Sequence, residues 1–200
     1  MTALKSVCVY CGSRHGIDPD FKAAATAFGE RLAAAGLTLV YGGGSIGLMG
    51  EVAHACLAAG GTVVGVIPRF LKDREVMLGE VSELVVTADM HERKRIMFER
   101  SDAFVALPGG VGTLEEVVEM MTWGQLGQHR KPVLLANINQ FWEPLLTLLA
   151  HMEEQAFIGP GWDVNYQVAE RVEDIIPTLE AARARLETER EPDRAALSRM

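Results

Sequence analysis

Short apolar runs alternate with helix-like segments along most of the chain, and this alternation restricts the possible folds more than any other feature. The apolar runs are expected to be strands at 6–10, 37–41, 61–67, 83–87, 103–110 and 131–137. The segments between them carry helix start and stop signals, and a further helix is expected at 142–157. Strands that are apolar throughout belong to parallel sheets covered on both faces. The sequence therefore predicts an α/β fold, a doubly wound parallel sheet flanked by helices on both faces.

The acidic composition narrows the range of partners. The 200 residues carry a formal net charge of -8 at pH 7, whereas nucleic acids and anionic membranes require extended positive surfaces. The N-terminus has no long apolar region followed by a cleavage site, and no stretch reaches the roughly 18 to 20 apolar residues of a spanning helix. We therefore expect a cytoplasmic protein whose partners include neither nucleic acid nor a membrane.

The three cysteines, Cys8, Cys11 and Cys56, do not make a disulfide framework. Cys8 and Cys11 form a C-x-x-C pair, a spacing that also occurs in zinc and redox sites. In a strand, however, residues three apart point to opposite faces, and the sequence has no second Cys or His pair to complete a zinc site. The pattern favours buried core residues, and we expect no metal and no cofactor.

Glycine-rich loops follow three of the expected strands: "CGSRHG" at 11–16, "YGGGSIGLMG" at 41–50 and "PGGVGT" at 108–113. The carboxyl ends of parallel strands lie at one edge of a sheet, so the three loops are expected at the same edge. Glycine lets a backbone approach a ligand closely, and the N–H groups at the start of the following helix attract anions. The loops therefore predict a phosphate-bearing small molecule. The candidate contacts in the first two loops are Ser13, Gly43 and Gly44.

The second loop matches G-x-G-x-x-G at Gly42, Gly44 and Gly47, the pattern of dinucleotide-binding folds. That pattern requires an acid about 20 residues further on to bind the ribose hydroxyls, and here the chain reads "VIPRF". Neither glycine loop ends in the Gly-Lys-Ser/Thr of a P-loop, so a ligand with one phosphate remains. We expect residues 1–186 to form a single Rossmann-like, nucleotide-binding domain and the charged residues 187–200 to form a frayed tail.

Two interpretations fit the acids after the third loop. Thr113 and Glu116 have the spacing of a capping box, in which both residues would serve only to start a helix. Alternatively, Glu115 and Glu116 lie one turn into a helix whose N-terminus holds the phosphate. A carboxylate there would repel the phosphate unless it faced another part of the ligand, such as a cation that develops during a reaction. The second interpretation makes an acid catalytic.

The run "HERKR", residues 91–95, is the densest group of bases in this acidic chain. It opens a helix, where cations oppose the helix dipole. The run is either a solvated charged face or an anion-binding group, in which Arg93 and Lys94 face the glycine loops.

Taken together, "YGGGSIGLMG", "MHERK", "PGGVGTLEE" and "WGQLGQHRKP" resemble the Lonely Guy (LOG) family of phosphoribohydrolases, from about Val7 to Pro132 and more loosely to a helix near Ile176. The resemblance implies hydrolysis of the N-glycosidic bond of a purine nucleotide, a cytokinin riboside 5′-monophosphate or AMP, with release of free base and ribose 5-phosphate. Many members carry the label lysine decarboxylase, but the sequence has no lysine signature for pyridoxal phosphate. A nucleotide-binding carrier or sensor without catalytic activity remains the alternative.

The resemblance also implies roles for particular residues. Arg93 and Glu116 correspond to the catalytic pair of the family. Members form dimers with sites near the subunit interface, which implies a homodimer. Met120, Met121 and Trp123 would then lie at the dimer face, although their composition also suits a core. The residues that correspond to substrate contacts are Glu75, Lys94, Gly110, Val111, Gly112, Thr113, Leu114, Glu115 and Thr122.

Overall fold

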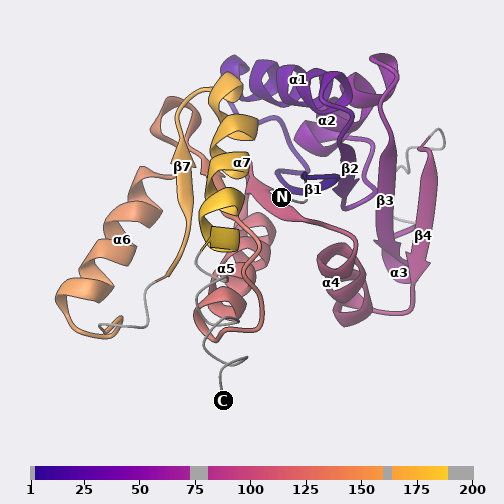
Figure 1. Ribbon diagram of the computed structural model, residues 1–200. Coiled ribbons are helices and arrows are strands. Elements are labelled where there is room, and N and C mark those ends of the chain that lie inside the picture. The colour runs from indigo at the N-terminus through magenta and orange to yellow at the C-terminus, as the bar shows by residue number, and fades with distance from the viewer. Residues whose placement is uncertain (1–2, 73–80, 160–163, 189–200) are drawn as a thin grey trace.

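The computed structural model describes residues 3–72, 81–159 and 164–188, which form a seven-stranded parallel sheet between two layers of helices (Figure 1). The predicted α/β fold is therefore confirmed. The strands are β1 Ser6–Tyr10, β2 Thr38–Tyr41, β3 Val63–Pro68, β4 Glu83–Thr87, β5 Ala103–Ala106, β6 Val133–Ala136 and β7 Gln167–Ala169. The helices are α1 Pro19–Ala34, α2 Gly47–Ala58, α3 Arg69–Lys72, α4 Met90–Glu99, α5 Val111–Gln125, α6 Glu143–Glu154 and α7 Val172–Thr188, with a short 3-10 helix at Ile138–Gln140.

The strand order, β4-β3-β2-β1-β5-β6-β7, shows where the chain reverses direction across the sheet. From the central β1 the chain moves outward to β4, and α4 then carries it back to β5 on the other side of β1. Val7 of β1 pairs with Leu39 of β2 on one side and with Ala103 of β5 on the other. The switch point therefore lies between β1 and β5, which is where ligands bind in sheets of this kind.

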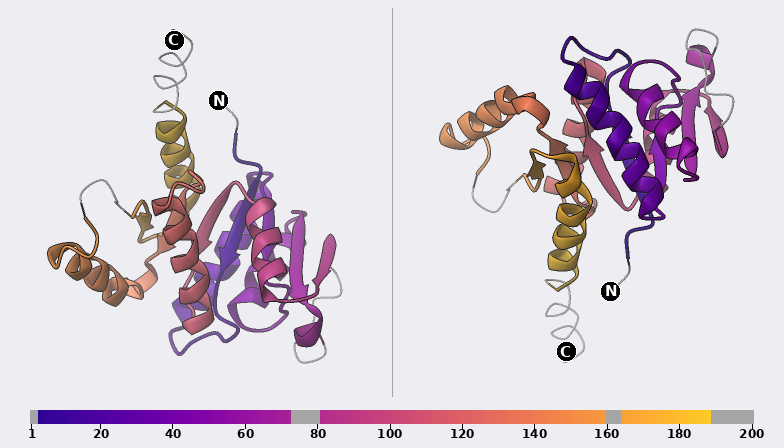
Figure 2. Two further views of the ribbon diagram at one scale, coloured as in Figure 1. Left: turned by 90° about the horizontal axis from the view of Figure 1, so that it is seen from below. Right: turned by 90° about the horizontal axis from the view of Figure 1, so that it is seen from above.

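Each face of the sheet has its own apolar core. Helices α1, α2 and α7 cover one face, while α4, α5 and α6 cover the other (Figure 2). Cys8 belongs to the second core and Cys11 to the first, and both thiols are free and buried. The two C-x-x-C residues thus point to opposite faces, as the strand interpretation predicts. No helix within the described residues is both long and apolar enough to cross a membrane.

The carboxyl-terminal part of the fold differs from the strand pattern in the sequence. We expected the apolar run at 131–137 to be the last strand, but β7 pairs with β6 beyond it. β7 has only three residues and lies at the edge of the sheet, so the continuous apolar pattern of a central strand is absent. Helix α7 packs against β7 and β6, and residues 189–200 of the expected tail lie outside the described part of the chain.

Candidate active site

Arg93 reaches the centre of the candidate site because the start of α4 is held in place. The Asp89 side chain caps the helix, its Oδ1 accepting a hydrogen bond from the Glu92 N–H at 2.8 Å. Glu92 returns the interaction, because its Oε2 accepts from the Ala88 N–H at 2.7 Å. The two bonds resemble a capping box, except that Glu92 accepts from the residue before the N-cap and not from the N-cap itself. They fix the start of α4 and place Arg93 in its first turn, at the carboxyl edge of the sheet.

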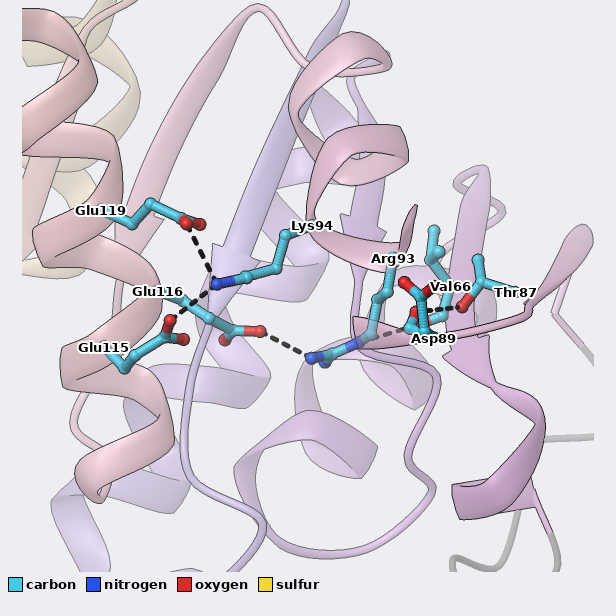
Figure 3. A network of polar contacts seen from close by, with 8 residues as sticks. All are labelled: Val66, Thr87, Asp89, Arg93, Lys94, Glu115, Glu116 and Glu119. Atoms are coloured by element: carbon cyan, nitrogen blue, oxygen red, sulfur yellow. Dashed lines mark hydrogen bonds and ion pairs between the residues drawn. The ribbon is translucent and has the colours of Figure 1, made fainter. Parts of the chain in front are cut away.

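The Arg93 side chain is paired with Glu116 of α5 (Figure 3). Arg93 Nη1 donates to Glu116 Oε1 at 2.7 Å, and Arg93 Nε donates to the carbonyl oxygen of Val66, at the end of β3, at 3.1 Å. Arg93 is 9% exposed and Glu116 8% exposed. The structure thus brings together the two residues that the family resemblance assigns to catalysis, and it buries both.

Two features of the surroundings shift the pKa of Glu116 in opposite directions. Burial raises the pKa of Glu116 above its ordinary value of 4.5, although the neighbouring Arg93 guanidinium opposes that rise. A carboxylate held in this way keeps its charge mainly through one cation. Any ligand that weakens the contact with Arg93 therefore makes Glu116 more basic.

The second glycine loop makes room for the guanidinium. A Cβ atom built on Gly42 would lie 2.3 Å from Arg93 Nη2 and 3.1 Å from the Met49 sulfur. Any side chain at position 42 must therefore displace Arg93. The sequence marks Gly42 as part of a phosphate-binding pattern, but in the structure its lack of a side chain serves the Arg93–Glu116 pair.

Replacing Gly42 by Ala is expected to move Arg93 off Glu116 and to lower kcat for base release, the activity proposed below, at least about tenfold. Overpacking of this kind costs about 1–3 kcal/mol, so Tm should fall by several degrees. Gly124→Ala is the matched control, because a Cβ atom there would lie 3.6 Å from His129 Cε1, an ordinary contact. A Gly42→Ala variant with native activity would show that Arg93 is not held by this loop.

The start of α5 decides between the two interpretations of Thr113. Helix α5 begins at Val111, with Gly110 as its N-cap, and no side chain among the described residues caps it. Thr113 is therefore the third residue of the helix, and the capping-box interpretation of Thr113 and Glu116 is wrong. The first turn instead leaves its N–H groups uncapped at the switch point, where they can receive an anion.

Lys94 extends the contact between α4 and α5 toward solvent. Its Nζ lies 2.7 Å from Glu115 Oε1 and 3.0 Å from Glu119 Oε1 (Figure 3). Partial burial lowers the pKa of Lys94, but the hydrogen bonds to these two carboxylates outweigh that effect and raise the pKa. Glu119 was not predicted as a site residue. It lies four residues after Glu115, a spacing that puts both acids on the same face of a helix and could have indicated its role.

The remaining predicted contacts lie at different depths. Ser13 and Gly110 line one hollow of about 340 Å³, together with Phe21 and Phe141. The other predicted residues divide by exposure: Gly43, Gly44 and Thr113 are buried, Leu114 is half-buried, and Val111, Gly112, Glu115 and Thr122 are exposed. Glu75 lies outside the described residues.

The methionines of α5 belong to the core of the chain itself. Met120 is 1% exposed and Met121 3% exposed, and both pack in the cluster on the α4–α6 face of the sheet. The half-buried Trp123 packs edge-to-face on Phe98. The core interpretation is confirmed for the two methionines, and the dimer-face interpretation is wrong for them.

A doubly wound parallel sheet with an uncapped helix N-terminus and a buried Arg–Glu pair at its switch point defines an α/β protein of the Rossmann-like class with a candidate acid–base centre. Residues 49–179 match the family model described as "Possible lysine decarboxylase". The chain is 46% identical over 177 residues to the cytokinin riboside 5′-monophosphate phosphoribohydrolase LOG5 of Arabidopsis thaliana, covering 88% of this chain and 78% of the relative. It therefore belongs to the LOG family.

A second curated relative agrees with this assignment, and a solved structure shares the fold. The probable phosphoribohydrolase LOGL2 of Oryza sativa subsp. japonica is 45% identical over 176 residues, which are 88% of this chain and 72% of the relative. Among solved structures, the molybdenum cofactor carrier protein of Chlamydomonas reinhardtii has a TM-score of 0.65 at 23% identity, with 90% of this chain and 98% of that chain covered. At that level of identity the likeness shows the fold alone.

Proposed function

We propose that the protein hydrolyses the N-glycosidic bond of purine riboside 5′-monophosphates, AMP or cytokinin nucleotides, releasing the free base and ribose 5-phosphate. The observation that carries the proposal is the buried Arg93–Glu116 pair, at 2.7 Å, beside the uncapped start of α5. The named activity of relatives that are about 45% identical supports it. No cofactor is required for this reaction.

The geometry of α5 matches the shape of such a substrate. Glu116 lies five residues after Val111, about 8 Å along the helix axis, a distance that a ribose 5-phosphate can bridge. The N–H groups of the first turn, with Gly110, Val111, Gly112 and Thr113, would hold the phosphate and thereby orient the ribose. The sugar would then lie near the carboxylate of Glu116.

Glu116 and Arg93 have complementary roles in this proposal. Cleavage of an N-glycosidic bond builds positive charge on the anomeric carbon, as in glycoside hydrolysis. The ionised Glu116 would stabilise that charge or remove a proton from the attacking water. Arg93 keeps Glu116 ionised despite its burial, and it would anchor the substrate as the contact between the two side chains loosens.

Two alternatives predict different chemistry. A lysine decarboxylase would bind pyridoxal phosphate through a deprotonated lysine, but the Lys94 ammonium lies between Glu115 and Glu119 with its pKa raised, so Lys94, the lysine of the candidate site, does not suit that role. A carrier would use the same uncapped helix start to hold a nucleotide. It would not need a buried carboxylate beside the phosphate, so the Arg93–Glu116 pair favours the enzyme.

Base release decides between enzyme and carrier. Purified protein incubated with AMP, or with isopentenyladenosine 5′-monophosphate, is expected to release free base and ribose 5-phosphate, and the ratio of the two rates gives the preferred base. Adenosine, which lacks the phosphate, should react at least about a hundredfold more slowly because the orienting contact is lost. Tight binding of AMP without release of adenine would contradict the enzyme and support the carrier.

A homodimer acting in the cytoplasm is part of the same proposal. One face of α5, continued by its C-cap Leu126, carries residues spaced three or four apart. The apolar members of this stripe are exposed: Val111 by 84%, Val118 by 38% and Leu126 by 54%. Thr122 lies on this stripe, at the opposite end of the helix from the uncapped start. We propose this exposed stripe as the dimer face, in place of the buried Met120 and Met121. Because the stripe begins at Val111, the second subunit would pack beside the active site.

A further inference from the structure

The segment "WGQLGQHRKP", residues 123–132, contributes nothing to the candidate active site. It begins in the last turn of α5, about 20 Å from Gly110 at 1.5 Å per residue, and continues beyond the helix. There it leads into β6 at the amino edge of the sheet, opposite the edge that carries the glycine loops. A separate role for this segment must therefore be sought at that edge.

His129 holds the turn of this segment in one conformation. Its Nδ1 accepts a hydrogen bond from the Lys131 N–H at 3.0 Å, so the ring proton is on Nε2, which donates to the Met120 carbonyl oxygen at 2.9 Å. Burial lowers the pKa of His129, which keeps the ring neutral at pH 7. Arg130 and Lys131 are thus presented by a rigid turn.

A hollow of about 520 Å³ opens beside this turn, a size suited to a small organic molecule. It lies between the end of α5, the start of β7 and helix α7, which runs beside β7 (Figure 1). Arg130, Lys131 and Arg185 line it, and none of the described residues around it is acidic. Tyr166 and Leu186 add an aromatic ring and an aliphatic side chain.

Two of the three cations, Lys131 and Arg185, have neutral partners within the described chain. Lys131 Nζ donates to the Phe98 carbonyl oxygen at 2.6 Å and lies 3.9 Å from the centre of the Phe98 ring. Arg185 donates to Gln167 Oε1 at 2.9 Å, and Arg130 is exposed. The ion pairs of the described residues include none of the three.

Two acids, Asp102 and Glu99, act electrostatically on Lys131, but neither lines the hollow. Asp102, the acid of an adjoining hollow of about 360 Å³, is already paired with Arg183 at 3.3 Å. The C-terminal ends of α5 and α7 each supply only about half a negative charge. The described lining of the hollow therefore carries three basic side chains and no acidic one, in a chain whose formal net charge is -8.

We propose that this hollow is a second ligand site, distinct from the active site, which binds a phosphate monoester with an aromatic or aliphatic body. Two arginines and a lysine match the charge of a phosphate dianion, and a guanidinium can donate two hydrogen bonds to its oxygens. The Tyr166 ring and the Leu186 side chain cover the body of the ligand. A nucleoside 5′-monophosphate has this chemistry.

The number of AMP molecules bound per chain tests the proposal. Equilibrium dialysis with AMP on the Glu116→Gln variant, in which turnover is suppressed, is expected to show two sites. Adding Arg130→Ala and Arg185→Ala should weaken one site at least tenfold and leave the other unchanged. The matched control is Arg31→Ala, which removes an exposed arginine in the last turn of α1. In the chain with native Glu116, the two arginine substitutions should leave kcat for AMP within about twofold.

Each outcome of the dialysis has a distinct meaning. A single site that the arginine substitutions do not affect overturns the inference. A single site that they abolish supports the second site, while it contradicts nucleotide binding in the active site. Displacement of AMP by sodium chloride as effectively as by inorganic phosphate at equal ionic strength would show non-specific ion pairing and also overturn it.

Discussion

Glu116→Gln is expected to lower kcat for release of adenine from AMP by about 10²- to 10⁴-fold, the range for loss of an acid–base or charge-stabilising group. The Gln carbonyl oxygen can still accept the hydrogen bond that Arg93 Nη1 gives to Glu116 Oε1 at 2.7 Å. The shape of the site is thus preserved while the negative charge is lost. KM for AMP should change much less than kcat, because in the proposed complex the start of α5 holds the phosphate and Glu116 does not.

The pH profile separates this role from a purely structural one. Burial raises the pKa of Glu116 above 4.5, so in the native enzyme kcat/KM should fall on the acid side with an apparent pKa above that value. The acid limb is expected to disappear in Glu116→Gln, which has no proton to bind at this position. Glu99→Gln, a change of an exposed acid on α4, should leave both the rate and the limb in place. A Glu116→Gln enzyme with the native rate would contradict the mechanism.

Arg93→Met is expected to destabilise the protein by about 3–5 kcal/mol, because it leaves the Glu116 carboxylate buried without its cation. In the double variant Arg93→Met with Glu116→Leu, most of the lost stability should be regained, because an apolar pair needs no countercharge. Activity should remain lost. Urea denaturation of the two variants at pH 7 measures both effects. If Arg93→Met costs less than about 1 kcal/mol, or if the double variant is no more stable than the single one, the pair does not hold α4 against α5.

The stability of the Arg93→Met variant should depend on pH in a predictable way. Without Arg93, burial raises the pKa of Glu116 further, so the folded state binds a proton more tightly than the unfolded state. The stability deficit is therefore fully present above the folded pKa. It shrinks as the pH falls from there toward the unfolded value near 4.5. Denaturation curves of Arg93→Met and of the native protein should converge over this interval.

Much of the fold was predictable because its signals are local. Six apolar runs predict the first six strands, and turn residues between them mark the helices. The structure departs from the pattern at β7, whose three residues are stabilised by pairing with β6 and by α7 rather than by their own composition. Parallel pairing at a sheet edge depends on contacts distant in sequence, which a local pattern does not contain.

The site was predictable in its residue types but less so in their partners. Arg93 and Glu116 were expected to act together, and the structure places them in contact. The sequence does not predict that Arg93 donates to the Val66 carbonyl oxygen. Nor does it predict that the Arg93 guanidinium occupies the space that a side chain at position 42 would need. In the sequence, Val66 looks like any strand residue and Gly42 like any turn glycine, because neither a backbone acceptor nor the need for empty space is encoded by residue type.

The amino-acid sequence alone specifies that acids follow a glycine loop at the carboxyl edge of a parallel sheet, because strand periodicity and turn chemistry are local properties. It does not specify which acid is buried. Glu115 and Glu116 are adjacent, and they point about 100° apart around α5. Only the docking of α5 on the sheet, with Met120 and Val117 packed in the core, turns Glu116 inward to Arg93 and leaves Glu115 outside with Lys94.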